Sequence, residues 1–397
     1  MSDPLATLAA LVQQYREIPA VEESADQLDL AGNHLLHMDN LAAMARIPQG
    51  SIDFVYIDPP FASNASYPLK IELPGHTLVR EAYTDIWPDG INSYLEFLVP
   101  RLAAIRPLLK PTGSLCVHLD THSSHYVKLA LDAFFGPEQL INEVIWRYGK
   151  MSNTSRRFPQ NHDTLFVYGG SPNWYFQPQF TRPSEYRARF ERDLTGNRLL
   201  FGTVKHRTDK LILRRIAARE KALGRSLRDD DVLFDFDTER KAQDDVFTDI
   251  SIIKGNAREG VGYATQKPMQ LLQRLIAAYS PPDGVVADFF CGSGTTGDAA
   301  AAMGRRWILA DIGLPAIQTA RLRLPDHRFH RDPALAPASF DIAENGEITD
   351  FRILDLNLNP VDSATVAQLL QSDPQALIAG TINGVAIDVF GREARPG

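Results

Sequence analysis

The chain has 397 residues, of which 44% are hydrophobic and 23% are charged, values ordinary for a soluble globular protein. This length allows one large α/β domain with a further domain, and because no apolar run reaches about 18 residues, no membrane span is expected. The N-terminus has neither the basic region nor the cleavage signature of secretion, and Cys116 and Cys291 have no metal-ligand spacing. We therefore expect a cytoplasmic protein without a metal site.

The net charge of −8, taken alone, argues against binding to nucleic acid. The charge is unevenly distributed, however. Residues 182–228 contain 14 Lys/Arg and 5 Asp/Glu, a net of +9, which leaves −17 for the rest of the chain. This segregation favours an acidic body that carries one basic module, although a solvated helical face would also explain it.

Hydrophobic patterns predict alternating strands and helices over residues 30–169, after an N-terminal helix and linker that occupy residues 1–29. The predicted strands are 34–39, 52–57, 114–119, 143–146 and 164–168, and the predicted helices are 5–15, 40–46, 94–109 and 125–135. Strand 52–57 is nearly all apolar, as expected of a strand that is buried on both faces. Such alternation indicates an α/β fold with a doubly wound, mostly parallel sheet.

This pattern breaks over residues 170–262, which are polar, charged and rich in arginine, and which include a predicted helix at 205–223. The pattern resumes over residues 263–330. There the predicted helices are 269–279 and 296–303, and the predicted strands are 285–289 and 307–310. Residues 170–262 are therefore interpreted as an insertion into the sheet domain. Residues 331–397 are predicted to form a small β/α appendage, whose role the sequence does not reveal.

A glycine-rich stretch, Asp-Phe-Phe-Cys-Gly-Ser-Gly-Thr-Thr, begins at Asp288 and leads from a predicted strand into a helix. Doubly wound sheets bind nucleotides at such loops, and Gly292 and Gly294 lack side chains that would block a ligand. Asp311 ends the next strand, 23 residues after Asp288, at the offset of a carboxylate that accepts hydrogen bonds from ribose hydroxyls. The loop has neither a dinucleotide fingerprint nor a phosphate-loop pattern, and Asp288 suits a positively charged ligand. S-adenosylmethionine fits this description, with a purely structural turn as the alternative.

The sequence Asp58-Pro59-Pro60-Phe61 directly follows the buried strand 52–57. Because the prolines remove two N–H donors, the loop presents acceptors only, the Asp58 carboxylate and the Pro59 carbonyl, beside the Phe61 ring. These are the groups that an exocyclic amino group of a nucleobase needs before its nitrogen lone pair can attack a methyl group. Such a base must first leave the stack, and catalysis then comes from positioning and polarisation. A surface turn is the plain alternative.

Together, these motifs resemble those of the amino-group DNA methyltransferases, which transfer a methyl group from S-adenosylmethionine to adenine N6 or cytosine N4. The catalytic loop precedes the cofactor loop, which is the order of the circularly permuted β class. Further matching segments are Met38-Asp39-Asn40 and residues 109–114, 142–146 and 263–268. The tail, at 351–356 and 387–391, resembles the modification subunits of type III restriction systems.

The resemblance implies a circularly permuted methyltransferase domain with an inserted target-recognition region. It divides the chain into an N-terminal helix and linker (1–29), a catalytic part (30–169), a target-recognition insertion (170–262), a cofactor-binding part (263–330) and the appendage (331–397). The implied catalytic residues are Asp58, Pro59, Pro60 and Phe61. The implied cofactor-binding residues are Asp39, Asp288, Phe290, Gly292, Gly294, Thr295, Asp311, Gln266 and Lys267.

Within this family Asp at position 58 favours adenine, whereas Ser favours cytosine N4, so N6-adenine is the leading hypothesis and N4-cytosine the alternative. A catalytically inactive DNA-binding specificity subunit and a methyltransferase of RNA or protein are further alternatives, which the intact loops and the basic insertion disfavour. The implied partner is double-stranded DNA. The resemblance allows either a restriction-modification system with a restriction subunit or an orphan methyltransferase, and it also allows a homodimer. It implies a bacterial or archaeal cytoplasm, near the nucleoid.

Overall fold

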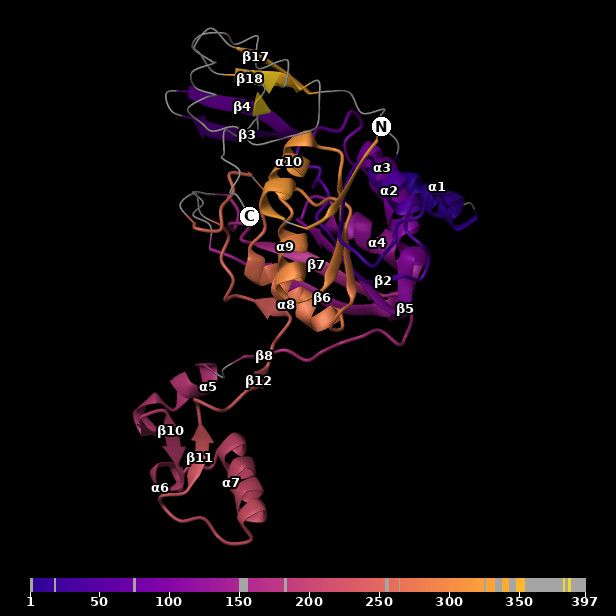
Figure 1. Ribbon diagram of the computed structural model, residues 1–397. Coiled ribbons are helices and arrows are strands. Elements are labelled where there is room, and N and C mark those ends of the chain that lie inside the picture. The colour runs from indigo at the N-terminus through magenta and orange to yellow at the C-terminus, as the bar shows by residue number, and fades with distance from the viewer. Residues whose placement is uncertain are drawn as a thin grey trace. The chain divides into compact units, whose positions relative to one another are not determined.

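The computed structural model (Figure 1) describes residues 3–17, 19–73, 76–149, 156–181, 184–253, 257–263, 265–324, 326–332, 338–342, 348–353, 381–382 and 385–386. The chain divides into two compact units, one formed by residues 1–177 and 245–397, and the other by residues 178–244. Within the described ranges, no helix has the length and apolar character needed to cross a membrane.

A nine-stranded sheet forms the centre of the first unit. In order across the sheet, the strands are β13 (Val246–Phe247), β6 (Leu140–Arg147), β7 (His162–Gly169), β5 (Leu109–Leu119), β2 (Ile52–Ile57), β14 (Val285–Asp288), β15 (Arg306–Asp311), β1 (His34–His37) and β16 (Arg328–Arg331). Every neighbouring pair is parallel except the two that include β7. The central strands β2 and β14 are buried along their whole lengths, as their apolar sequences require.

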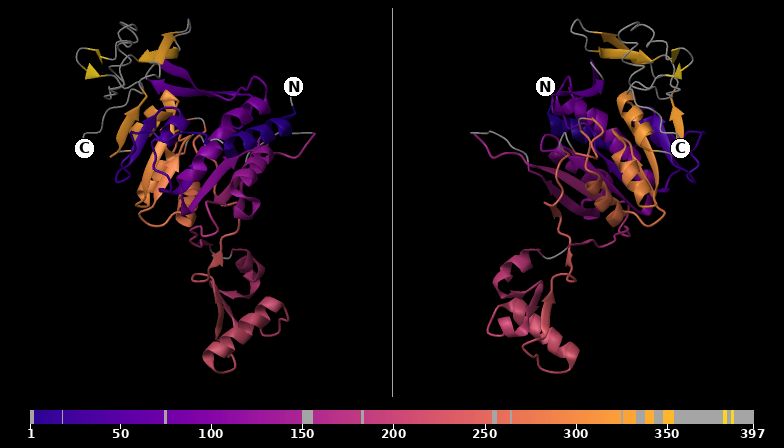
Figure 2. Two further views of the ribbon diagram at one scale, coloured as in Figure 1. Left: turned by 90° about the vertical axis from the view of Figure 1, so that its right-hand side faces the viewer. Right: turned by 60° about the vertical axis from the view of Figure 1, so that its left-hand side comes forward.

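Helices cover both faces of this sheet (Figure 2). One face carries α1 (Pro4–Glu17), α2 (Asn40–Ala45), α3 (Ile91–Ile105) and α4 (Ser124–Phe135), and the other carries α8 (Met269–Tyr279), α9 (Thr295–Ala302) and α10 (Leu314–Arg323). In α8, for example, Leu271, Leu272, Leu275, Ile276 and Tyr279 are buried, which is the spacing of one helical face. The prediction of a doubly wound, mostly parallel α/β sheet is confirmed.

The helix predicted at 94–109 differs in both of its ends. It begins at Ile91, after Gly90 with its positive φ of 56°, and ends at Ile105. A 3₁₀ turn over Arg106–Leu108 follows because Pro107 cannot donate the backbone hydrogen bond that would continue the helix. The chain then enters β5 directly.

The Asp-Pro-Pro-Phe loop is followed by a long hairpin. The sequence patterns did not predict this hairpin. It consists of β3 (Ser66–Leu73) and β4 (His76–Thr84). Strand β4 pairs with β18 (Ile348–Ile353), which in turn pairs with β17 (Ala338–Ile342), so the predicted appendage shares a sheet with the hairpin. The short strands β19 (Thr381–Ile382) and β20 (Val385–Ala386) pair with each other. The rest of the tail, including residues 354–356 and 387–391, lies outside the described residues.

The second unit has a hydrophobic core of its own. Its elements are β8 (Phe180–Thr181), α5 (Ser184–Arg189), a 3₁₀ turn (Glu191–Asp193), β9 (Leu194–Thr195), β10 (Arg198–Leu200), α6 (Phe201–Val204), α7 (Lys210–Leu223), β11 (Val232–Asp235) and β12 (Lys241–Ala242). The core consists of Phe190, Leu199, Val204, Ile212, Leu227, Leu233, Phe234 and Phe236. The predicted helix 205–223 begins at Lys210 instead, because the Asp209 side chain caps it by accepting a hydrogen bond from the Ile212 N–H.

Candidate active site

The two predicted loops leave the sheet side by side. Strands β2 and β14 are parallel neighbours, with Val55 opposite Ala287, so Asp58 and Asp288 both lie at the carboxyl edge of the sheet. In doubly wound sheets this edge is where ligands bind. The catalytic and cofactor loops therefore meet across adjacent strand ends.

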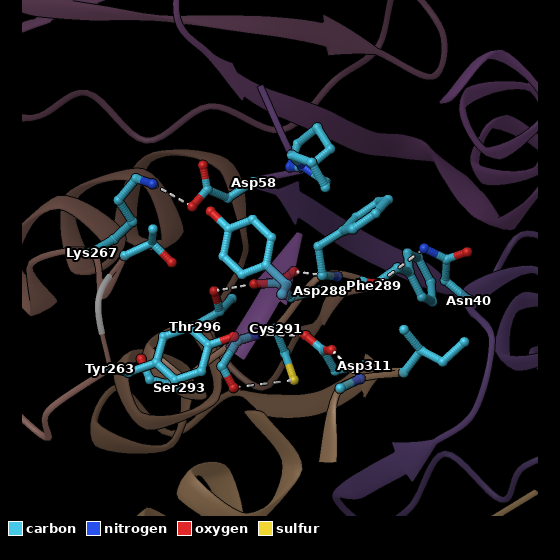
Figure 3. A pocket seen from close by; sticks show the side chains of 18 of the residues that line it. Asn40, Asp58, Tyr263, Lys267, Asp288, Phe289, Cys291, Ser293, Thr296 and Asp311 are labelled. Atoms are coloured by element: carbon cyan, nitrogen blue, oxygen red, sulfur yellow. Dashed lines mark hydrogen bonds and ion pairs between the residues drawn. The ribbon is translucent and has the colours of Figure 1, made fainter. Parts of the chain in front are cut away.

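A cavity of about 450 Å³ opens between these loops (Figure 3). The predicted site residues that line it are Asp39, Asp58, Pro59, Pro60, Phe61, Gln266, Lys267, Asp288, Phe290, Gly292, Thr295 and Asp311. Gly294 is the one predicted site residue that does not line it. The structure thus brings together residues from both ends of the family pattern, from position 39 to position 311.

Gly294 serves helix packing. It caps α9 with a φ of 78°, and a Cβ there would lie 2.9 Å from the Cβ of Ala320, far too close. Its missing side chain therefore makes room for α10 and not for a ligand. Gly292, by contrast, lines the cavity with a φ of 48°, and a Cβ there would approach the ring of Tyr263 to 3.3 Å.

Two carboxylates form the floor of the cavity, Asp288 buried and Asp311 half-buried. Asp288 accepts hydrogen bonds from the Phe290 N–H at 3.0 Å and the Thr296 hydroxyl at 2.5 Å. Asp311 accepts from the Gly292 N–H at 2.9 Å and the Gly313 N–H at 2.7 Å. Burial raises the pKa of Asp288 to about 7 and that of Asp311 to about 6. A positively charged ligand in the cavity would stabilise the ionised form of both.

The catalytic-loop carboxylate is paired on one side and open on the other. Oδ2 of Asp58 forms an ion pair with the Lys267 ammonium. Oδ1 of Asp58 is buried and, among the described atoms, has no hydrogen-bond partner. A buried carboxylate oxygen without a donor is costly, so this atom is suited to receive a donor from a bound molecule.

Asp85 holds the catalytic loop, a role that sequence reasoning missed. Its side chain, in a residue only 1% exposed, accepts hydrogen bonds from the backbone N–H groups of Phe61 (3.1 Å), Ala62 (3.0 Å) and Ser63 (2.7 Å). It also accepts from the Ser63 hydroxyl at 2.6 Å and from the Trp87 indole at 2.7 Å. Ala62 has a φ of 59°, a conformation disfavoured for residues with a side chain. Asp85 therefore fixes a strained turn that sets the Phe61 ring.

Asp39 is more occupied than its predicted role requires. Oδ1 accepts from the Leu41 N–H at 2.8 Å, which caps α2, and Oδ2 accepts from the Arg101 guanidinium at 2.8 Å. Arg101 also donates to Oδ1 of Asn40 and stacks on the Phe97 ring at 3.8 Å. Burial lowers the pKa of Arg101. Both oxygens of Asp39 thus already accept one protein donor each, although the residue lines the cavity.

Two of the predicted cofactor-binding residues, Gln266 and Thr295, form hydrogen bonds within the protein. The Gln266 side chain accepts from the Val261 N–H at 2.9 Å and donates to the Glu259 carbonyl at 2.7 Å, so it orders its own loop. The Thr295 hydroxyl accepts from Arg323 at 2.9 Å. Both residues still line the cavity, where their contribution is to shape the wall.

Aromatic side chains form much of the wall, and most of them lie outside the predicted motifs. Those outside the motifs are Tyr56, Tyr67, Tyr83, Trp87 and Phe97. Tyr67 and Tyr83 stack across the base of the hairpin, with ring centroids 4.8 Å apart. The alternation Tyr83, Asp85, Trp87, where the hairpin ends, is the sequence signal that could have identified this wall.

The lining suits S-adenosylmethionine. It combines buried carboxylates for a ligand with sulfonium and ammonium charges, oxygen acceptors for ribose hydroxyls, and aromatic faces for an adenine ring. Among the lining residues, Lys267 and Arg101 are already paired with Asp58 and Asp39, so no unpaired cation there favours a phosphate. The residues present therefore fit this cofactor.

A doubly wound sheet with an acceptor loop and an acidic glycine-rich loop opening into one cavity defines the S-adenosylmethionine-dependent methyltransferase class. More narrowly, the chain belongs to the N6/N4 DNA methylase family, whose model matches residues 52–321. It is therefore a DNA methyltransferase, and the predictions of this family and of S-adenosylmethionine as its cofactor are confirmed.

Relatives in this family are similar at moderate identity. The type II methyltransferase M.EcaI of Enterobacter cloacae is 24% identical over 323 residues, which cover 73% of this chain and 69% of that protein. The Mod subunit of the type III restriction-modification enzyme StyLTI of Salmonella typhimurium is 25% identical over 327 residues, 68% of this chain but 50% of that subunit. Among solved structures, the cytosine-N4-specific PvuII DNA methyltransferase aligns over 94% of this chain and 98% of its own, with 14% identity and a TM-score of 0.47.

Proposed function

We propose that this protein is a site-specific adenine-N6 methyltransferase, which acts on an adenine flipped out of double-stranded DNA. The observation that carries the proposal is Oδ1 of Asp58, which is buried and has no hydrogen-bond partner among the described atoms. Asp58 and Phe61 both line the cavity. If a base stacks on Phe61, its exocyclic amine would donate one N–H to this oxygen and the other to the Pro59 carbonyl.

The chain's own residues account for the chemistry by positioning. S-adenosylmethionine supplies a methyl group bonded to a positively charged sulfur. Asp288 and Asp311 would hold the positively charged donor and its ribose, while Asp58 and Pro59 hold the two amine hydrogens, so the nitrogen lone pair is directed at the methyl carbon. With the cofactor bound, the amine nitrogen would bond to the methyl carbon as the methyl–sulfur bond leaves its electrons on sulfur, and Asp58 or water would accept one amine proton. The negative charge of Asp58 lies beside the amine nitrogen as that nitrogen becomes positive, and this stabilises the transition state.

The second unit is the proposed target-recognition module. Residues 178–244 contain 16 Lys/Arg and 12 Asp/Glu, a net of only +4, because the acidic stretch after residue 228 offsets much of the basic charge. Several cations are paired there, as in Arg225 with Asp231 at 2.7 Å. On α7, however, Lys210, Arg214 and Lys221 are exposed, and none of them has an ion-pair partner among the described residues. These three are the proposed phosphate contacts.

Two aspects of the biological setting are also proposals. The likeness to a Mod subunit supports a restriction-modification context, in which a restriction subunit would be the partner. A homodimer is proposed with it. Size-exclusion chromatography with light scattering tests the dimer, since a mass near 44.2 kDa would identify a monomer and exclude the dimer.

Nucleoside analysis tests the choice of base. Plasmid DNA is incubated with the purified protein and S-adenosylmethionine, digested, and analysed by mass spectrometry. We expect N6-methyladenine, and N4-methylcytosine without N6-methyladenine would overturn the choice. Asp58→Ala is the control, since it removes the amine acceptor and should abolish transfer while S-adenosylmethionine still binds. Single-molecule sequencing of the same DNA would identify the recognised sequence.

A further inference from the structure

The ammonium group of Lys267 reaches Asp58, the carboxylate that we propose as the acceptor of the target amine. The Lys267 ammonium pairs with Oδ2 of Asp58 and lies 5.1 Å from the centroid of the Phe61 ring. The Lys267 and Asp58 side chains are 13% and 15% exposed, and 209 residues separate them in the chain. Figure 3 shows both on one side of the cavity, with Asp311 on the other. Lys267 therefore lies beside the catalytic loop, although the family pattern suggests a cofactor role.

The pair presents an acceptor and a donor next to each other. Oδ1 of Asp58 is open, and the Lys267 ammonium has three donor hydrogens, of which the bond to Asp58 uses one. The Watson–Crick edge of adenine carries the N6 amine donor beside the N1 acceptor, and that of cytosine carries N4 beside N3. Guanine and thymine carry an oxygen where these bases carry the amine, and the Asp58 carboxylate would repel it. The two side chains thus complement amino-substituted bases.

We propose that Lys267 donates a hydrogen bond to the ring nitrogen adjacent to the target amine. This inference rests on the proposed function, because it needs a base stacked on Phe61 with its amine on Asp58. Lys267 then has two effects. It completes recognition of the amino edge, and it occupies the in-plane lone pair of the ring nitrogen, which in free adenine and cytosine is the stronger nucleophile toward methyl donors. Methyl transfer is thereby directed to the exocyclic nitrogen, with the same bonds formed and broken as above.

A base analogue that lacks the acceptor tests this contact. Two DNA duplexes are compared, one with adenine and one with 1-deazaadenine at the target position, where a C–H replaces N1 and the amine is kept. If the target is cytosine, 3-deazacytosine takes this place. The wild type should methylate the analogue with a kcat/KM about 10- to 100-fold lower, as expected for the loss of a hydrogen bond to a charged group. Lys267→Met, which keeps an unbranched side chain one atom shorter and removes the ammonium, should treat both duplexes alike.

The matched control is a second Lys–Asp pair, between Lys110 on β5 and Asp53 on β2. Lys110 pairs with Asp53 at 2.7 Å, at the opposite end of β2, so Lys110→Met should retain the wild-type discrimination. Calorimetry of S-adenosylmethionine binding should give the same Kd for Lys267→Met and the wild type.

Three results would overturn the inference. One is equal methylation of both duplexes by the wild type, which needs no variant to fold. Another is undiminished discrimination by Lys267→Met, because the effect would then belong to the base alone. The third is that Lys267→Met loses cofactor affinity and keeps discrimination, which would place the lysine at the cofactor. If the wild type methylates no base in any duplex, the proposed function itself fails, and the inference fails with it.

Discussion

Asp85→Asn should reduce methyl transfer without reducing cofactor binding. In the wild type, Oδ2 of Asp85 accepts three hydrogen bonds, from the Phe61 and Ser63 N–H groups and the Ser63 hydroxyl, and Oδ1 accepts two, from the Ala62 N–H and the Trp87 indole. An asparagine whose oxygen keeps the first three must direct its NH₂ group at the last two donors. The substitution therefore breaks at least two bonds to a charged acceptor.

The size of the effect follows from these two bonds. A hydrogen bond to a charged group contributes about 1.5 kcal/mol at the lower end of its range, which suits partly exposed donors, so the loop loses about 3 kcal/mol. If all of this appears as release of the loop, the fraction of molecules with Phe61 in place falls by up to about 150-fold. We expect kcat to fall by about 10- to 150-fold, while the Kd for S-adenosylmethionine changes less than about threefold, because Asp85 does not line the cavity.

Single-turnover methyl transfer with labelled cofactor gives the rate, and calorimetry gives the Kd. Asp53→Asn is the matched control. Asp53 is 4% exposed and accepts from Lys110 at 2.7 Å and from the Val285 N–H at 2.8 Å, at the amino end of β2. Its loss should lower the melting temperature but not the rate of the folded enzyme. A rate for Asp85→Asn within threefold of both the wild type and Asp53→Asn would refute the reasoning.

Three further predictions concern the cofactor and DNA. Burial raises the pKa of Asp288 to about 7, so its carboxyl is increasingly protonated below that pH. Affinity for the positively charged cofactor should therefore rise with pH by up to about tenfold per unit until the pKa is passed. Calorimetry that shows constant affinity from pH 5.5 to 8 would contradict this. Gly292→Val should weaken cofactor binding at least about tenfold because it adds atoms to the cavity wall. Gly294→Ala should instead lower the melting temperature through its clash with α10 and leave the cofactor Kd of the folded protein unchanged. The opposite pattern would show that the roles of the two glycines are exchanged. Replacing Arg214 and Lys221 with Ala together should weaken DNA binding and reduce the salt slope, d log K/d log[salt], by about 2; an unchanged slope would remove α7 from the DNA interface.

The sequence by itself determined seven of the nine strands of the sheet and the two loops that open at its edge. Strand 52–57 was predicted with its observed ends, and the loops at Asp58 and Asp288 follow from the patterns directly before them. These features are local. A buried parallel strand needs a continuous apolar run, and a tight turn into a helix needs glycine at fixed positions, so both leave a signature within about ten residues.

Only the tertiary structure decided which side chains from distant parts of the sequence come into contact. It paired Lys267 with Asp58 across 209 residues, and placed Asp85 beneath the catalytic loop after a hairpin that no pattern predicted. It also turned Gly294 toward a helix instead of a ligand. The partner of a carboxylate or the neighbour of a glycine depends on which strands and helices become adjacent. That adjacency is fixed by burial of the whole sheet, to which no short stretch of sequence corresponds.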